Sequence, residues 1–180
     1  MDNDRLKNYI LVGFMGSGKT RIGRELAKMA DMTFYDTDEL IEKAAGKKIR
    51  QIFREEGEAS FRERETKLIR GLVDAHSEGG VYSTGGGLAM REENRKLLHQ
   101  LGTVIFLDID FDTAWSRLQN DTKRPLLQTP DRAGTILRLL DERRPLYLDA
   151  ADLIVRADNT APRHKVKEIL TRSAQAGKSD

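Results

Sequence analysis

Short apolar runs alternate along the chain with stretches in which apolar residues recur every three or four positions. The runs predict five strands, at residues 9–12, 33–35, 81–84, 103–107 and 153–155. The helical spacing predicts a helix with Ile22, Leu26 and Met29 on one face, and others at 39–45, 49–55, 59–75, 92–101, 112–119, around 136–147 and around 166–170. Residues 121–132 are polar with two prolines and predict a loop, and the tail from residue 174 is expected to fray.

Strands that alternate with helices are typical of βαβ units, which build a parallel sheet covered by helices on both faces. No linker or repeat divides the chain, so residues 1–180 are expected to form a single domain. Right-handed crossovers place the carboxyl ends of all the strands on one edge of the sheet, where ligands bind. A functional motif should therefore follow a strand directly.

Composition excludes several kinds of chemistry. The chain has no cysteine, which rules out disulfides, cysteine-ligated metals and a cysteine nucleophile, and its three histidines (76, 99 and 164) are not at metal-ligand spacing. No apolar stretch is long enough for a membrane span and residues 1–7 are polar, so we expect a cytoplasmic protein. The 31 basic residues are balanced by 29 acidic ones, and no basic strip with stacking aromatics predicts a nucleic-acid partner.

Residues 13–20 read Gly-Phe-Met-Gly-Ser-Gly-Lys-Thr and match the pattern G-x-x-x-x-G-K-[ST] directly after the first predicted strand. In such a loop the backbone N–H groups point at phosphate oxygens, Lys19 reaches the β- and γ-phosphates, and the Thr20 hydroxyl ligates Mg²⁺. The alternative is a glycine-rich turn without a ligand. No N-K-x-D sequence indicates a GTPase, and the length of the chain favours a small-molecule kinase.

Asp36 and Asp38 follow the second predicted strand and, in an extended segment, would point the same way. One carboxylate could then serve Mg²⁺ while the other accepts the proton of an acceptor hydroxyl. The alternative for Asp38 is a helix cap. Asp108 is the rival magnesium ligand, and Asp36 is preferred because Asp108 is expected to lie one strand further from the phosphate loop.

Three other features suit the acceptor side of such a site. Gly85–Gly87 end the third strand and would let backbone approach a ligand closely, unless they form only a flexible turn. Arg62 and Arg143 have apolar neighbours, which suggests partial burial and a carboxylate partner rather than a place on the surface. Arg124 opens the loop at 121–132, which is either a linker turn or a lid that brings this charge to a triphosphate and excludes water.

Together these motifs resemble the shikimate kinase family over nearly the whole chain. They are residues 13–20, Asp-Thr-Asp at 36–38, residues 52–62, Glu65, the glycines at 85–87, Arg-Pro-Leu-Leu at 124–127 and Glu-Arg-Arg-Pro-Leu-Tyr at 142–147. The resemblance implies a three-layer α/β/α P-loop fold with strand order 2-3-1-4-5, a substrate-binding helical segment at about 39–75 and a mobile lid at about 121–132. It also implies transfer of the γ-phosphate of ATP to the 3-hydroxyl of shikimate, on the route to chorismate and aromatic amino acids.

The same resemblance assigns roles to single residues. Asp38, Lys19 and Arg124 would be catalytic, and shikimate would be bound by Asp38, Arg62, Gly86 and Arg143, with Phe53 and Phe61 beside the ring and Glu65 orienting Arg62 or a substrate hydroxyl. ATP would be held by Gly16, Ser17, Gly18, Lys19, Thr20, Arg21, Arg117 and Arg124, with residues 157–161 on the adenine side. Thr20 and Asp36 would serve Mg²⁺.

The chain departs from the family pattern at two points. Many members have Ser and then Thr after the phosphate-loop lysine, where this chain has Thr20 and Arg21, and Ser83-Thr84 stand where other P-loop proteins carry an acidic residue. Two other functions compete with the shikimate assignment: a kinase of another hydroxy acid such as gluconate, and a regulatory module that binds ATP without catalysis. For a kinase of shikimate or of another hydroxy acid, we expect a monomer whose partner is a small-molecule substrate.

Overall fold

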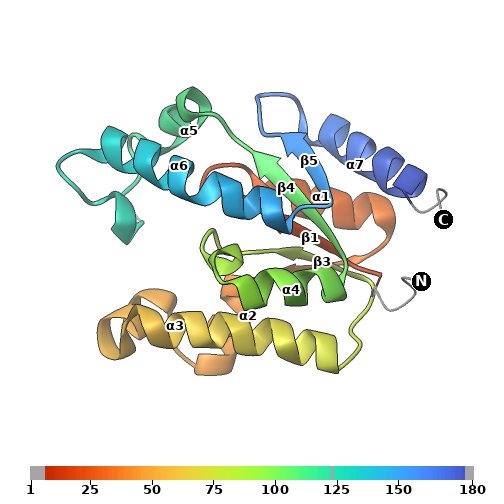
Figure 1. The fold of residues 1–180 in the computed structure, drawn as a ribbon, viewed down its shortest axis with the longest axis horizontal. Helices are drawn as coiled ribbons and strands as arrows, with labels where there is room; N and C mark the ends of the chain where they lie inside the picture. Colours follow the sequence, from red (N-terminus) through yellow and green to blue (C-terminus); the bar gives the residue numbers. More distant parts are fainter. Residues whose placement is uncertain (1–6, 123, 177–180) are drawn as a thin grey trace.

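The computed structural model describes residues 7–122 and 124–176, which form a five-stranded parallel sheet between layers of helices (Figure 1). The strands are β1 (Tyr9–Val12), β2 (Thr33–Asp36), β3 (Gly80–Ser83), β4 (Thr103–Asp108) and β5 (Leu153–Arg156). Their order is β2-β3-β1-β4-β5, so the implied order is confirmed. Parallel pairing sets Tyr9 beside both Val81 and Thr103, which brings the ends of β1, β3 and β4 to one edge.

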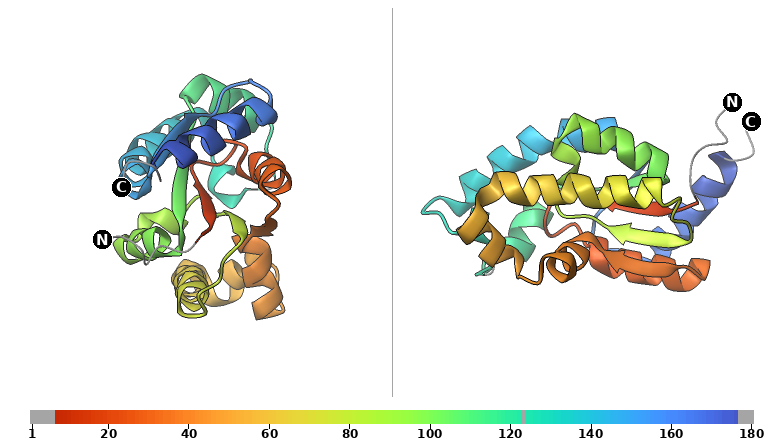
Figure 2. Two further views of the ribbon diagram at one scale, coloured as in Figure 1. Left: turned by 90° about the vertical axis from the view of Figure 1, so that its right-hand side faces the viewer. Right: turned by 90° about the horizontal axis from the view of Figure 1, so that it is seen from below.

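Helices cover both faces of the sheet. They are α1 (Lys19–Ala30), α2 (Thr37–Ala45), α3 (Ile49–Asp74), α4 (Glu92–Leu101), α5 (Phe111–Leu118), α6 (Arg132–Ala150) and α7 (Pro162–Ala176), with 3₁₀ turns η1 (Leu88–Met90) and η2 (Pro125–Leu127). α1 and α7 pack together on one face, while α4 and α6 pack on the other (Figure 2). The segment between α5 and α6 lies at the opposite end of the molecule from the chain termini (Figure 1).

The predicted strands and helices are confirmed to within a few residues at their ends, with two informative differences. The helices expected at 49–55 and 59–75 are confirmed as the two segments of α3, which are separated by a non-helical Gly57 with φ 85°. α2 begins at Thr37, two residues earlier than expected. The prediction of a frayed tail from residue 174 is wrong for 174–176, which continue α7, and 177–180 lie outside the described residues.

The apolar core follows from the central position of β1 and β4. Ile10, Leu11 and Val12 of β1 are fully buried, as is the middle of β4, because helices cover both faces of these strands. Each such side chain contributes roughly 1.5–3 kcal/mol by leaving water. Ile41, Ile52 and Phe61 form a second, smaller cluster where α2 packs on α3. Within the described residues no helix is long and apolar enough to cross a membrane.

Candidate active site

The phosphate-binding loop turns sharply between β1 and α1. Gly16 and Gly18 have φ of 79° and 91°, a left-handed conformation that residues with a Cβ rarely adopt. Gly18 precedes α1 and no side chain caps this helix. The first N–H groups of α1 therefore remain available to an anion at the positive end of the helix.

The side chain of Lys19 lies over the phosphate-binding loop that precedes it. Its Nζ donates hydrogen bonds to the carbonyl oxygens of Gly13 at 2.7 Å and Phe14 at 2.9 Å. Burial lowers the pKa of this amine to about 8, although the nearby Asp38 carboxylate opposes the shift. The amine is thus placed within the loop, where it can exchange neutral carbonyl partners for phosphate oxygens.

A cavity of about 350 Å³ opens beside this loop at the carboxyl edge of the sheet. It is lined by residues from the phosphate loop, β2, β3, the glycine run and the segment after α5, among them Lys19, Thr20, Arg21, Asp36, Asp38, Ser83, Gly85, Gly86 and Arg124. The structure therefore brings the phosphate-side residues together with Asp36, Asp38 and Gly86, whereas Arg62 and Arg143 do not line this cavity. Their roles remain predictions.

Oxygen atoms suited to Mg²⁺ meet at one side of this cavity. Thr20 Oγ1 lies 3.5 Å from Asp36 Oδ2 and 3.4 Å from Ser83 Oγ. Hydroxyl and carboxylate oxygens are the ligands that Mg²⁺ prefers, usually with phosphate and water completing its shell. No cluster of three or more acidic or histidine side chains that could hold a metal occurs among residues 7–122 and 124–176. Ser83 was not anticipated in this group, although its place at a strand end was a usable signal.

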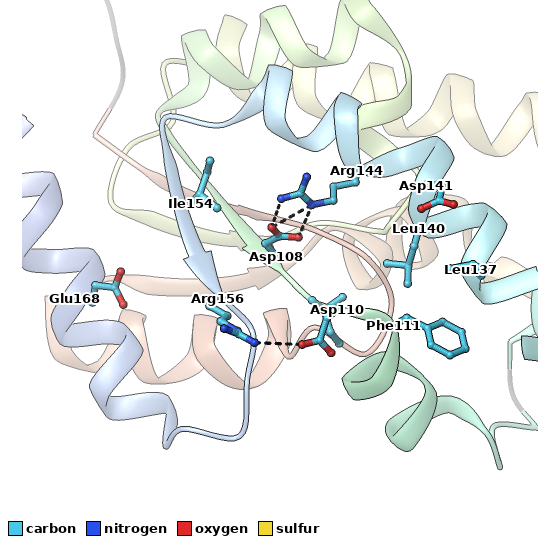
Figure 3. A pocket seen from close by; sticks show the side chains of 11 residues that line it. Asp108, Asp110, Phe111, Leu137, Leu140, Asp141, Arg144, Ile154, Arg156 and Glu168 are labelled. Carbon is cyan, nitrogen blue, oxygen red and sulfur yellow. Dashed lines mark hydrogen bonds and ion pairs between the residues drawn. The ribbon is translucent and has the colours of Figure 1, made fainter.

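Asp108 lies outside this group. It pairs with Arg144, whose Nη2 is 2.7 Å from Asp108 Oδ2, and both line a different cavity of about 640 Å³ (Figure 3). The reason given for preferring Asp36 is nevertheless wrong, because β4 is the direct neighbour of β1 whereas β2 is two strands away. Asp36 reaches Thr20 because α1 packs chiefly over β2 and β3.

Asp38 occupies the first turn of α2, and the cap of this helix is Asp36, whose Oδ1 accepts from Asp38 N at 3.0 Å. The expected extended segment at 36–38 is therefore wrong, since helix begins at Thr37. Asp38 Oδ1 is buried without a hydrogen-bond partner. Burial and the neighbouring Asp36 raise the pKa of Asp38 to about 6, against the pull of Lys19. Such an oxygen is free to accept a proton from a bound hydroxyl.

Arg62 is held by two glutamates of its own helix. Its Nη1 lies 2.7 Å from Glu65 Oε2 and its Nη2 lies 3.0 Å from Glu58 Oε1. Glu65 is fully buried and its other oxygen has no partner. Burial raises the pKa of Glu65 to about 7 in spite of the attraction of Arg62. Glu65 was expected to orient Arg62 or a hydroxyl, and this geometry permits both.

Arg143 and Tyr147 lie four residues apart on one face of α6 and meet the same backbone carbonyl. Arg143 Nη1 donates to Gly86 O at 3.4 Å, and the Tyr147 hydroxyl donates to it as well. Tyr147 belongs to the motif at 142–147, but the sequence predicted no role for it. The rings of Phe53 and Phe61 are 4.9 Å apart, a tilted pair within α3, and belong to the small apolar cluster between α2 and α3.

The expected lid is partly ordered by its own contacts. Arg124 forms an ion pair with Asp121, and its side chain is 44% exposed although it lines the phosphate cavity. Leu127, in η2, is fully buried, and its carbonyl accepts from Arg132 Nε at 3.0 Å. The loop ends at residue 131, because α6 begins at Arg132.

Arg117, on α5, bridges the phosphate loop and the segment after β5. Its Nη1 donates to Gly16 O at 2.7 Å, and its Nη2 donates to Asp158 O at 3.0 Å and to Asn159 Oδ1 at 3.1 Å. A second cavity, of about 320 Å³, lies here, and Arg21 stands at its rim. It is lined further by Ser17, Gly18, Thr160 and Lys165.

The buried carboxyl of Glu65 makes a testable contribution to stability. Its folded pKa of about 7 exceeds the ordinary 4.5, so the stability it contributes is present below pH 4.5 and is lost as the pH rises through 7. We therefore compare the unfolding free energy of Glu65→Gln with that of the unchanged protein at two pH values. The difference in favour of the variant should rise by about 2 kcal/mol from pH 5 to pH 8, at 1.36 kcal/mol per pKa unit. Urea titrations at both pH values measure this.

The control is Glu58→Gln, which removes a carboxylate from the same arginine at the surface, where the Glu58 side chain is 61% exposed. Its stability difference should change little with pH. A Glu65→Gln difference that is equal at pH 5 and pH 8 would contradict the expected cost of the buried charge.

Comparison with known proteins identifies the family of this chain. Residues 15–174 match the model of the family described as shikimate kinase. A shikimate kinase of Sulfurihydrogenibium sp. is 44% identical over 167 residues, 93% of this chain and 98% of that protein. One from Pseudomonas putida strain KT2440 is 45% identical over 170 residues, 94% and 98% of the two chains. The structure of Acinetobacter baumannii shikimate kinase in complex with shikimate has a TM-score of 0.88 at 36% identity and covers 96% of each chain. The chain belongs to the shikimate kinase family.

Proposed function

We propose that the cavity beside the phosphate loop is where this chain transfers the γ-phosphate of ATP to the 3-hydroxyl of shikimate. The observation that carries the proposal is the unpartnered, buried oxygen of Asp38, which lines the same cavity as Lys19 and Arg124. A kinase needs a base for the acceptor hydroxyl next to donors for the triphosphate. Both are present at one edge of the sheet.

The reaction assigns a separate task to each of these side chains. The hydroxyl oxygen of shikimate attacks the γ-phosphorus, the bond between that phosphorus and the oxygen of ADP breaks, and the hydroxyl proton passes to Asp38. Lys19 and the loop N–H groups hold the phosphates in line. Arg124 offsets the negative charge on the transferring group.

Thr20 and Asp36 are the residues that would hold Mg²⁺, with Ser83 Oγ close by. When bound, the metal would neutralise charge on the phosphates. Asp36 Oδ1 already caps α2. Its Oδ2 would therefore be the oxygen available to the metal, so that one carboxylate would both cap the helix that carries Asp38 and help to hold the cation.

The carboxylate of shikimate is assigned to Arg62 and Arg143, beside Gly86. Arg62 is prearranged by Glu58 and Glu65, so little side-chain freedom is lost when a substrate binds. A guanidinium keeps further N–H donors for an incoming carboxylate after these contacts. Phe53 and Phe61 of the same helix would contact the ring.

The nucleotide base is assigned to the second cavity, between Arg117 and residues 157–161, with Gly16, Ser17, Gly18 and Arg21 toward the phosphates. Its rim carries Arg21 and Arg117, which suits a polyanionic ligand. A monomeric state, a cytoplasmic location, and the lack of nucleic-acid and membrane partners stay predictions.

Release of ADP tests the function directly. With ATP and Mg²⁺, we expect turnover with shikimate, at least tenfold lower kcat/KM with its methyl ester, and none with gluconate. The ester keeps every hydroxyl but removes the negative charge that Arg62 and Arg143 would bind. Equal activity with gluconate would favour a kinase of other hydroxy acids, and ATP binding without ADP release would favour a regulatory module.

A further inference from the structure

Lys165 is one of two charged side chains, with Glu65, that are buried among the described residues. It lies on α7, is 5% exposed as a residue, and lines the cavity assigned to the nucleotide base. Lysine is rarely buried without an ionic partner. Here its Nζ donates to Asp158 Oδ1, in the segment that joins β5 to α7.

Asp158 connects this lysine to the rest of the cavity wall. Its Oδ1 also accepts from Thr160 N at 2.8 Å, and its backbone carbonyl accepts from Arg117 Nη2 at 3.0 Å. Arg117 in turn donates to Gly16 O in the phosphate loop at 2.7 Å. A continuous series of contacts therefore runs from α7 through Asp158 and α5 to the loop that binds phosphate.

The charges around this cavity give Lys165 a second effect. Asp158 brings a carboxylate to the wall of a cavity whose ligand would carry several negative charges. Lys165 and the Thr160 N–H hold the pKa of that carboxyl well below its usual range, so it stays ionised. Without the lysine, this negative charge would face the nucleotide with no cation paired to it.

We propose that Lys165 is a positioning residue for the nucleotide: it fixes residues 158–160 against Arg117 and neutralises Asp158 in the wall of the cavity that takes the nucleotide. The inference rests on the proposed function in one respect, that this cavity takes a nucleoside di- or triphosphate. It assigns Lys165 no contact with the reacting atoms. Its effect should therefore fall on nucleotide affinity and leave shikimate affinity unchanged.

Lys165→Met keeps a long apolar stem in the buried site and removes the charge. By isothermal titration, we expect its Kd for ADP to rise about tenfold, since charge-assisted hydrogen bonds are the stronger kind. KM for shikimate and kcat at saturating ATP should stay within about twofold of the unchanged protein. Lys167→Met, at an exposed position of the same helix, is the matched control and should bind ADP normally.

The double variant separates positioning by charge from simple packing. If Lys165 acts by neutralising and holding Asp158, then adding Asp158→Asn removes the unpaired charge, and Lys165→Met with Asp158→Asn should bind ADP more tightly than Lys165→Met alone. A packing defect would not be rescued in this way. Should Lys165→Met fail to fold, Lys165→Gln, which keeps a donor without the charge, is the variant to titrate and should show the same loss and rescue.

Three results would overturn the inference: unchanged ADP affinity in the folded variant, equal weakening of ADP and shikimate, or no rescue by Asp158→Asn. Each of these leaves the proposed function intact, because the unchanged protein still binds ADP and phosphorylates shikimate. If the unchanged protein bound no ADP, the proposed function and the inference would both be overturned.

Discussion

Replacing Arg124 with alanine is expected to lower kcat by about 10²–10³-fold, the scale seen when one preorganised electrostatic donor is lost. In the structure this guanidinium is paired with Asp121 and is 44% exposed, yet it lines the phosphate cavity. For the proposed catalytic role, its charge would have to move from Asp121 to the transferring group as water is excluded. The loss should therefore appear in the chemical step, and the Kd of shikimate alone should change little.

Arg138→Ala provides the matched control, because Arg138 lies on α6 and pairs with Glu142 at the surface. It should leave kcat within about twofold. Hydrogen exchange gives an independent measurement: amides at 124–132 should exchange more slowly once shikimate and a non-hydrolysable ATP analogue are both bound. Normal kcat for Arg124→Ala, with equal exchange in both states, would mean that this segment is a surface loop without a catalytic role.

Asp38→Asn should reduce kcat by about 10²-fold or more, the usual scale for a general base. The substitution keeps the size of the side chain and removes its ability to take the hydroxyl proton. The affinity for an ATP analogue should be largely kept, because the contacts of the phosphate-loop glycines and Lys19 with the phosphates do not involve the hydroxyl proton. Rapid-quench measurement of phosphate transfer, alongside titration of the analogue, separates the two effects.

Glu39→Gln is the control for Asp38→Asn, since it removes a carboxylate from the same helical turn at an exposed position. It should retain nearly full activity. Turnover of Asp38→Asn close to that of the unchanged protein would show that Asp38 is not the base.

Local sequence patterns predicted most of the elements because the strands are short runs with apolar residues at their centres. Residues 103–107, all but one of them buried in β4, could hardly form anything other than a central strand. The separation of two helices near residue 57 was also predicted from the apolar spacing. The structure gives its cause, because Gly57 adopts φ 85° there. The 3₁₀ turns η1 and η2 were missed, since three residues are too few to show a period.

The candidate site was predicted less well where it depends on contacts between distant segments. Periodicity cannot say that β4 and β3 flank β1; the strand order implied by the resemblance does, and the reason given against Asp108 was inconsistent with that order. Nor can it say that Asp36 caps α2, or that Tyr147 and Arg143 share the carbonyl of Gly86. Motifs were enough to predict the candidate site residues themselves. Their hydrogen-bond and ion-pair partners could be identified only from the three-dimensional structure.

The glycines after β3 owe their identity to what surrounds them. A Cβ at Gly85 would lie 2.8 Å from Asp38 Oδ1 and 3.2 Å from Glu65 Oε1, and one at Gly87 would overlap the guanidinium of Arg62. Neither glycine has the left-handed backbone that would demand glycine for its own sake. A side chain at position 87 would therefore displace the guanidinium of Arg62 from its place between Glu58 and Glu65. The defect caused by Gly87→Ala would thus be that of a misplaced arginine rather than that of a strained backbone.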